Sequence, residues 1–266
     1  MFETTNIFNT LLIIPILNAL IGVYKLLTLV AIPGALGFSL IILTVIIRLI
    51  LHPLTAAQLK STQKMAQMKP HLDRLSAQYK NDKTRLQQEQ LNLYKEAGIN
   101  PASGCLPLLI QMPILIGLYN LFFQLLNPEN SVEKIVTSIN NVVYFPFLKI
   151  ATLDLSFFGL NLAYKPSDWQ KYGWFLLAIP VITALLQYYQ TKTMMPPAPK
   201  AIVKSNEEPK KEDMNEMMQK QMTIMMPLMI GFFAFSFPIG LALYWNTYTI
   251  FGIIQQRHLN KNVPKK

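Results

Sequence analysis

The sequence has few charged side chains. Only 14% of its 266 residues are charged, whereas 52% are hydrophobic, and a soluble domain usually carries about a quarter charged residues. It also has a single cysteine, Cys105, so we expect no intramolecular disulfide, no multi-cysteine metal site and no lipoprotein anchor. We interpret the chain as a membrane protein and Cys105 as a small packing residue.

Acidic residues are missing from every long apolar run. All 14 Asp and Glu lie outside five runs that are each about long enough, at ~1.5 Å per residue, to cross most of a ~30 Å hydrocarbon layer. Intramembrane aspartyl proteases and most proton-coupled transporters need carboxylates at that depth. The three histidines show no metal-ligand spacing, and there is no glycine-rich phosphate loop. The sequence therefore argues against an enzyme and an ATP-driven pump, and predicts no catalytic residue, metal site or cofactor.

Basic residues are concentrated in alternate segments. The segments 55–104, 191–220 and 255–266 hold 18 of the 24 Lys and Arg, and basic loops tend to stay in the cytoplasm. This predicts an all-α, polytopic membrane protein with five transmembrane helices, an external N-terminus and a cytoplasmic C-terminus. No basic residue precedes the first apolar segment, so a cleavable signal peptide is not expected.

The predicted segments are listed here in chain order: 1–34, external N-terminus with an interfacial amphipathic helix; 35–54, first span; 55–104, cytoplasmic helical hairpin; 105–126, second span; 127–171, external loop; 172–190, third span; 191–220, cytoplasmic linker; 221–237, fourth span; 238–256, fifth span; 257–266, cytoplasmic tail. Residues 11–30 leave two alternatives open, a sixth span or a helix lying flat in the outer interface. The narrow polar stripe of Asn18, Gly22 and Lys25 and the interruption at Pro15 favour the flat helix.

Arg48 lies inside the otherwise aliphatic stretch TVIIRLILHPL of the first predicted span. An arginine there costs several kcal/mol, although a snorkelling side chain can reach the headgroups. Helical periodicity places Thr44 on the same face, and a snorkelling residue needs no polar stripe beside it. We therefore favour a hydrated polar cavity. Polar stripes that share it are, on the first span, Gly37, Thr44, Arg48, His52 and Thr55; on the third, Pro180, Thr183, Gln187 and Gln190; on the fifth, Tyr244, Thr247, Tyr248 and Gln255.

Several motifs together resemble the YidC/Oxa/Alb family of membrane protein insertases. They are LTVIIRLILHPL (43–54), NPASGCLPLLIQMPILIGLY (100–119), IPVITALLQ (179–187) and MMPLMIGFFAFSFPIGLALYWNTY (225–248), and they follow the family order. The resemblance implies a core of five spans, with an external interfacial helix before the first and a cytoplasmic hairpin after it. It therefore favours the interfacial interpretation of residues 11–30.

The resemblance also implies a hydrophilic groove that is open to the cytoplasm and closed on the outside. Arg48 would attract acidic residues in the translocated tail of an incoming protein, and Gln187 and Trp245 would line the groove. Their implied neighbours are Thr44, Thr183, Tyr244 and Asn246. The substrate would leave along the second and fourth spans, where the implied contacts are Met112, Pro113, Met225, Met226 and Pro227.

The implied partners are nascent membrane proteins and the lipid bilayer, with the Sec translocon, the signal recognition particle pathway and the ribosome as further candidates. No direct sequence-specific nucleic-acid binding is expected. The lack of a transit-like presequence favours a bacterial plasma membrane over an organelle. Compared with the family pattern, we expect a member that consists of the core alone, without an extra first span or a large external domain. Two alternatives stay open: a small-solute channel or facilitator that uses the same polar stripes, and a non-catalytic assembly factor that recruits other machinery through the hairpin.

Overall fold

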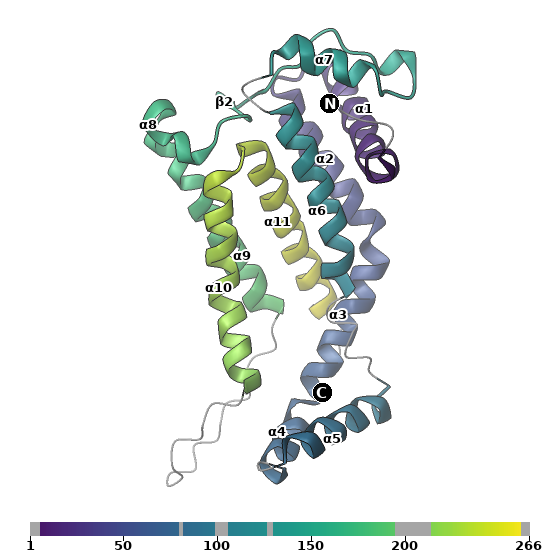
Figure 1. The fold of residues 1–266 in the computed structure, drawn as a ribbon, viewed down its shortest axis with the longest axis vertical. Coiled ribbons are helices and arrows are strands. Elements are labelled where there is room, and N and C mark those ends of the chain that lie inside the picture. The colour runs from purple at the N-terminus through teal and green to yellow at the C-terminus, as the bar shows by residue number, and fades with distance from the viewer. Residues whose placement is uncertain (1–5, 80–81, 99–105, 127–129, 195–213, 262–266) are drawn as a thin grey trace. The chain divides into compact units, whose positions relative to one another are not determined.

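The computed structural model describes residues 6–79, 82–98, 106–126, 130–194 and 214–261 (Figure 1). Most of the described chain is helical, which confirms the predicted all-α class. Two compact units divide it. The first unit contains α1, α2 up to Leu49, α6 from Ile114 onward and all later elements, and the second contains α3, α4, α5 and the start of α6. The two units are described separately below.

The helices of the first unit have the following bounds: η1 Asn9–Ile13, α1 Ile14–Leu29, α2 Ala35–Ile50, α6 Leu106–Leu125, α7 Val132–Asn140, η3 Pro146–Leu148, η4 Pro166–Asp168, α8 Trp169–Tyr172, η5 Trp174–Leu177, α9 Ala178–Met194, α10 Met214–Ser236 and α11 Ile239–Lys261. Helix α9 packs against both α10 and α11. The α9–α10 contact is close because Gly231 has no side chain. A Cβ there would lie 2.9 Å from the Cβ of Ala184.

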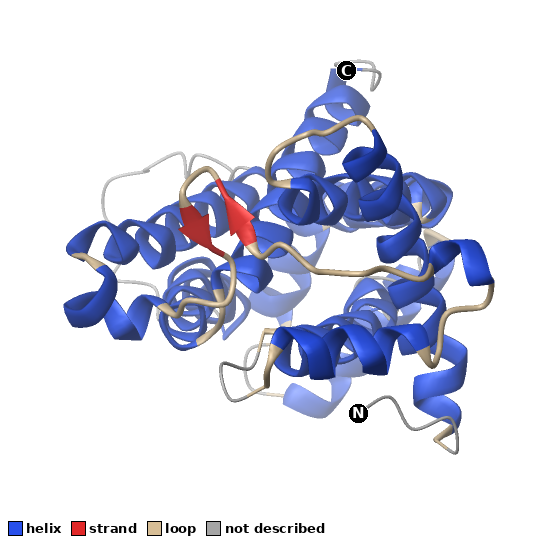
Figure 2. Cartoon of the chain, turned by 90° about the horizontal axis from the view of Figure 1, so that it is seen from above, coloured by secondary structure: helices blue, strands red, loops and turns tan. Residues whose placement is uncertain are grey.

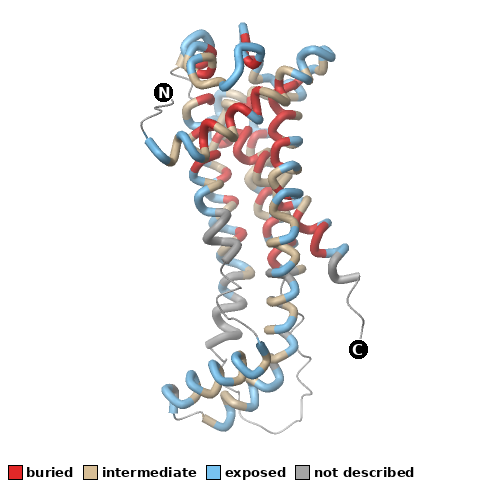
Figure 3. The backbone as a smooth tube through the Cα atoms, turned by 90° about the vertical axis from the view of Figure 1, so that its right-hand side faces the viewer, coloured by how far each residue is buried: buried red, intermediate tan, exposed pale blue. Residues whose placement is uncertain are grey.

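An apolar core joins most elements of this unit. Its fully buried members include Leu17 and Leu20 of α1, Leu36 of α2, and Leu121 and Phe122 of α6. Figure 3 shows the buried residues in red along these helices. Many apolar side chains on α2, α9, α10 and α11 remain exposed. Large exposed apolar surfaces on several helices are typical of chains that contact lipid.

The polar stripe of α1 faces a neighbouring segment of the same protein. The buried Asn18 amide donates to the carbonyl of Val142 at 3.2 Å and accepts from the backbone N–H of Tyr144 at 2.7 Å. Lys25 donates to the carbonyls of Phe147 and Lys149. The α1 side chains therefore hold the loop after α7 along the stripe through hydrogen bonds to its backbone, which apolar residues in these places could not form.

Two short antiparallel strands, β1 (Ser156–Phe157) and β2 (Leu160–Asn161), form a hairpin that the sequence analysis does not predict (Figure 2). The ring of Phe157 packs on the first turn of α2, where a Cβ on Gly37 would lie 2.1 Å from it. Phe157 also makes an edge-to-face contact with Phe38, with ring centroids 5.3 Å apart. The glycine therefore creates the space that docks the hairpin on α2.

The second unit contains α3 (His52–Gln67), α4 (Lys69–Gln78) and α5 (Lys83–Glu96). Helix α4 contacts both α3 and α5. Asp82 caps α5, since its carboxylate accepts from the backbone N–H of Arg85 at 3.0 Å. Partial burial raises the pKa of the Tyr94 phenol. The predicted first span, 35–54, includes all of α2 and the beginning of α3, and a turn at Leu51 separates the two helices.

By length and composition, one helix in the described part of the chain could cross a membrane, and it comprises residues Asn9–Leu29. Shorter apolar helices are Ala35–Ile50, Met112–Leu125 and Thr223–Ser236. The N-terminal helix that passes this test is the segment predicted to lie flat in the interface. Its polar stripe does not decide between the two placements, because the loop after α7 covers it.

Candidate functional site

Arg48 is the centre of a polar cluster in the first unit. Its side chain is 5% exposed and turns toward α11, where Nη2 donates to the carbonyl of Tyr248 at 2.7 Å and Nη1 to Oε1 of Gln255 at 3.5 Å. The guanidinium carbon lies 3.4 Å from the centroid of the Tyr248 ring. Arg48 is therefore held by protein groups and does not extend along the surface as a snorkelling arginine would.

Gly252 allows this close approach. A Cβ on Gly252 would lie 2.6 Å from Nη2 of Arg48 and 2.5 Å from Nε2 of Gln190. Real Cβ atoms do not make contacts this short, so any larger residue would displace both side chains. Because Gly252 has no side chain, the Arg48 guanidinium can approach α11 closely enough to reach the Tyr248 carbonyl.

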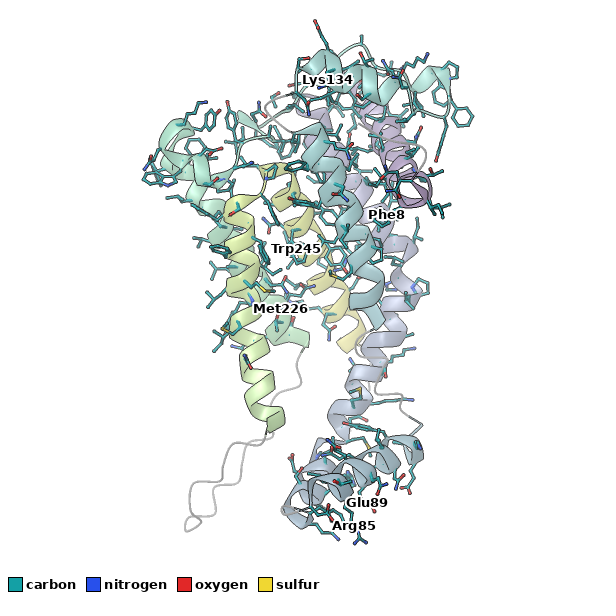
Figure 4. All side chains as sticks on the ribbon, viewed as in Figure 1. Phe8, Arg85, Glu89, Lys134, Met226 and Trp245 are labelled. Atoms are coloured by element: carbon teal, nitrogen blue, oxygen red, sulfur yellow. The ribbon has the colours of Figure 1, made fainter. Side chains whose placement is uncertain are left out.

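A second hydrogen bond joins α9 to α11. The indole Nε1 of Trp245 donates to Oε1 of Gln187 at 3.1 Å, and Nε2 of Gln187 lies 3.4 Å from Oγ1 of Thr191. Gln187 is 7% exposed. Figure 4 labels Trp245 on α11. The structure thus brings together two residues, 58 positions apart in sequence, that the sequence analysis assigns to the groove.

The predicted threonines Thr44 and Thr183 are nearly inaccessible, and both bond within their own helices. Thr44 donates to the carbonyl of Leu40 at 2.6 Å, and Thr183 to that of Ile179 at 2.8 Å. Such back-bonding satisfies a hydroxyl in an apolar environment. These threonines therefore place polar atoms at the site without offering a free donor.

Tyr244 and Asn246 complete the predicted set on α11. Tyr244 is 2% exposed, and its ring centroid lies 6.0 Å from that of Tyr248. Asn246 is partly buried, and its Oδ1 has no hydrogen-bond partner among the described residues. Asn246 therefore has an acceptor to offer to an incoming polar group.

An apolar cavity of about 250 Å³ is lined on α11 by residues that precede Tyr248 in the chain. Its walls come from α6, α9, α10 and α11, and Thr183 and Trp245 belong both to this wall and to the predicted groove. The remaining lining residues are Leu115, Ile116, Tyr119, Ile230, Phe233, Ala234, Phe237, Leu241 and Ala242. The Trp245 indole therefore borders the apolar cavity and also bonds to polar Gln187.

The predicted exit contacts are distributed over two helices. On α10, Met225 is 57% exposed, Met226 is partly buried (Figure 4) and Pro227 is buried. On α6, Met112 is 43% exposed and Pro113 is exposed, and both belong to the second unit. The structure gathers none of these five residues around the cavity. Their role stays a prediction.

The structure adds the direct contacts of Arg48 to the sequence-based expectation. The guanidinium is enclosed by a tyrosine ring, a backbone carbonyl and a glutamine, and the hydrated cavity beside it stays a prediction. The enclosure is possible because α11 offers a carbonyl beside a glycine, which a hydropathy pattern does not reveal. Sequence reasoning missed Gly252 altogether. It also missed the buried polar residues Thr191, Thr249 and Gln256. The sequence signal that could have identified Gly252 is its position one helical turn after Tyr248, a member of the polar stripe.

The part of the chain that the structure describes gives the charge of Arg48 no acidic bonding partner. Among the described residues, its bonding partners are the neutral Tyr248 and Gln255, and its Nε has no hydrogen-bond partner. The same part of the chain contains no group of three or more His, Cys, Asp or Glu that could hold a metal ion. A buried guanidinium with a free N–H is suited to binding a carboxylate.

The fold and the site define a mostly helical protein with exposed apolar helix faces and a buried arginine whose bonding partners among the described residues are neutral. A family model described as 60Kd inner membrane protein matches residues 28–266. The chain belongs to this family, the YidC/Oxa/Alb family, as the sequence motifs predict. The match begins within α1 and so leaves most of that helix outside it.

The relatives are longer proteins. The membrane protein insertase YidC of Rickettsia felis is 31% identical over 233 residues, which is 86% of this chain and 36% of that protein. The corresponding protein of Rickettsia akari is 30% identical with the same coverage. A crystal structure of an active YidC insertase, with its first transmembrane domain resolved, is 27% identical with a TM-score of 0.51 and matches 95% of this chain and 46% of its own. The chain therefore spans less than half the length of these relatives.

Proposed function

We propose that this protein is an insertase and chaperone for membrane proteins. It acts as a multi-pass protein of a bacterial plasma membrane, with its N-terminus outside, its C-terminus in the cytoplasm and the segments predicted above. It works by lowering a physical barrier and not by chemical catalysis. The observation that carries the proposal is the buried Arg48, whose partners among the described residues are all neutral.

The barrier is the cost of moving a polar tail through hydrocarbon, which is several kcal/mol for each charge. A groove that opens to the cytoplasm and ends at Arg48 shortens the dry part of that path. The guanidinium pairs with an acidic group of the tail at that depth. The membrane potential then draws a negative tail outward, by ~2.3 kcal/mol per charge per 100 mV.

The apolar part of the client leaves toward lipid along α6 and α10. The cavity between these helices, α9 and α11 is lined by aromatic and aliphatic side chains, which suit an apolar segment. Met225, Met226 and Pro227 of α10 and Met112 and Pro113 of α6 are the proposed exit contacts. Nascent membrane proteins are the clients, and the Sec translocon, the signal recognition particle pathway and the ribosome are candidate partners.

Complementation of a bacterium depleted of its own insertase tests the proposal. We compare the wild-type chain with Arg48→Ala and Arg48→Lys. Wild type and Arg48→Lys should support insertion of acidic-tailed clients, because both keep a cation at this depth, and Arg48→Ala should fail. Normal insertion of acidic-tailed clients by Arg48→Ala would refute the role of Arg48. Failure of the wild-type chain to restore insertion of any client would refute the insertase function itself.

A further inference from the structure

The Arg48 guanidinium is held on one side and has an unpaired donor on another. The Tyr248 ring covers one face of its plane at 3.4 Å, and Nη2 is bound to the carbonyl of the same residue at 2.7 Å. In contrast, Nε is buried and has no hydrogen-bond partner among the described residues. A guanidinium has five N–H donors in a fixed plane, so holding one face and one nitrogen fixes the direction of the rest.

Two residues one helical turn apart make these contacts of Arg48 possible, and we call the two contacts together the grip. Tyr248 supplies both the ring and the carbonyl, and Gly252 supplies the space through which Nη2 reaches that carbonyl. A Cβ at position 252 would lie 2.6 Å from Nη2. An alanine there would push the guanidinium off the carbonyl while leaving its charge in place.

The geometry points to Tyr248 and Gly252 as positioning residues that hold Arg48 with its Nε–H directed to a client carboxylate. This inference rests on the proposed insertase function and adds how α11 selects for acidic clients. A freely rotating arginine offers only its charge, whereas a held guanidinium offers a donor in a defined direction. Charge-assisted hydrogen bonds of this kind are about twice as strong as neutral ones.

These contacts also stabilise the buried cation before a client arrives, since the described residues supply no acidic bonding partner. A cation over a tyrosine face is attracted by the electron-rich face of the ring, most strongly when both groups are desolvated. The Tyr248 carbonyl and the Gln255 side-chain oxygen accept hydrogen bonds from further donors. None of these partners is negatively charged. A carboxylate is therefore not excluded from the site by repulsion and adds an interaction that the resting site lacks.

The test compares two clients that differ only in their translocated tail, one with Asp residues and one with Asn at the same places. Translocation is measured by protease accessibility from outside in cells depleted of their own insertase. The readout is the ratio of the acidic to the neutral client, because a general loss of folding lowers both. The variants are Tyr248→Leu, Tyr248→Phe and Gly252→Ala in the full chain.

Tyr248→Leu and Gly252→Ala should lower the ratio about three- to tenfold, and Tyr248→Phe should keep it because the ring and the carbonyl remain. Tyr188→Leu and Gly22→Ala are matched controls: Tyr188 is 41% exposed, and a Cβ on Gly22 would meet Leu148 at an ordinary 3.8 Å. In an Arg48→Ala background, Tyr248→Leu should have no further effect on the ratio.

Three results would overturn the inference. An unchanged ratio in both Tyr248→Leu and Gly252→Ala would show that the grip is irrelevant. Equal loss of both clients would show that these residues serve only stability. A further fall of the ratio when Tyr248→Leu is added to Arg48→Ala would show that Tyr248 does not act through Arg48. In each case wild type would still insert both clients, so the proposed insertase function would survive.

Discussion

At the scale of single residues, the polar stripes contain side chains with different tasks. Arg48 bonds across to α11, and Gln187 accepts from Trp245, so both connect helices. Thr44 and Thr183 bond their own backbones. Helical periodicity identifies all of these positions, because each lies on an inward face. It does not identify their partners, because a partner such as the Tyr248 carbonyl is 200 positions away and belongs to the backbone.

Two glycines provide a prediction at the same scale, because replacing each by alanine should change the stability of the fold differently. Gly231→Ala places a Cβ 2.9 Å from the Ala184 Cβ and 3.3 Å from the Pro180 carbonyl. Helices α9 and α10 must then separate, which should destabilise the fold by about 1–3 kcal/mol. Gly22→Ala meets only an ordinary contact, so it should be neutral or stabilise the fold by up to about 1 kcal/mol through helix propensity.

Thermal unfolding in detergent measures both variants against wild type. The midpoint should fall for Gly231→Ala and stay equal or rise for Gly22→Ala. Shifts of the same sign and size would mean that the close α9–α10 packing contributes nothing beyond helix propensity.

At the scale of elements, α1 shows the limit of pattern reasoning. Asn18, Gly22 and Lys25 form a polar stripe that in the sequence favours a helix lying flat in the outer interface. In the structure the loop after α7 covers it, with hydrogen bonds from Asn18 and Lys25 to backbone groups of that loop. A stripe predicts that something polar lies opposite. It cannot predict whether this is solvent or a loop more than 100 residues further along the chain.

The placement of α1 follows from a labelling experiment. Single cysteines are introduced at Asn6, Lys134 and Arg74 in a Cys105→Ser background, and intact cells are treated with a membrane-impermeant maleimide. All three residues are exposed. If α1 lies flat outside, Asn6 and Lys134 should react in intact cells and Arg74 only after lysis.

A different pattern would correct the predicted topology. Reaction of Lys134 in intact cells but of Asn6 only after lysis would mean that α1 crosses the membrane, as its length and composition allow. Reaction of Arg74 in intact cells would place α4 outside and reverse the predicted orientation.

At the scale of the whole molecule, the sequence predicts the class and the family correctly, because apolar runs, charge distribution and motifs are local properties. It predicts neither the β1–β2 hairpin nor the interruption between α2 and α3 at Leu51. The hairpin depends on Phe157 docking beside Gly37, and that contact is tertiary. The same holds for the site. Its residues are predicted, and their enclosure around Arg48 is not.

The central claim is that Arg48 assists translocation by binding acidic residues of the client. The most direct measurement is the translocation rate of otherwise identical clients whose tails carry an increasing number of Asp residues, in depleted cells that express wild type or Arg48→Ala. The advantage of wild type should be absent for a tail without Asp and should grow with each one added. An advantage that is the same for every tail, or no advantage at all, would contradict the claim.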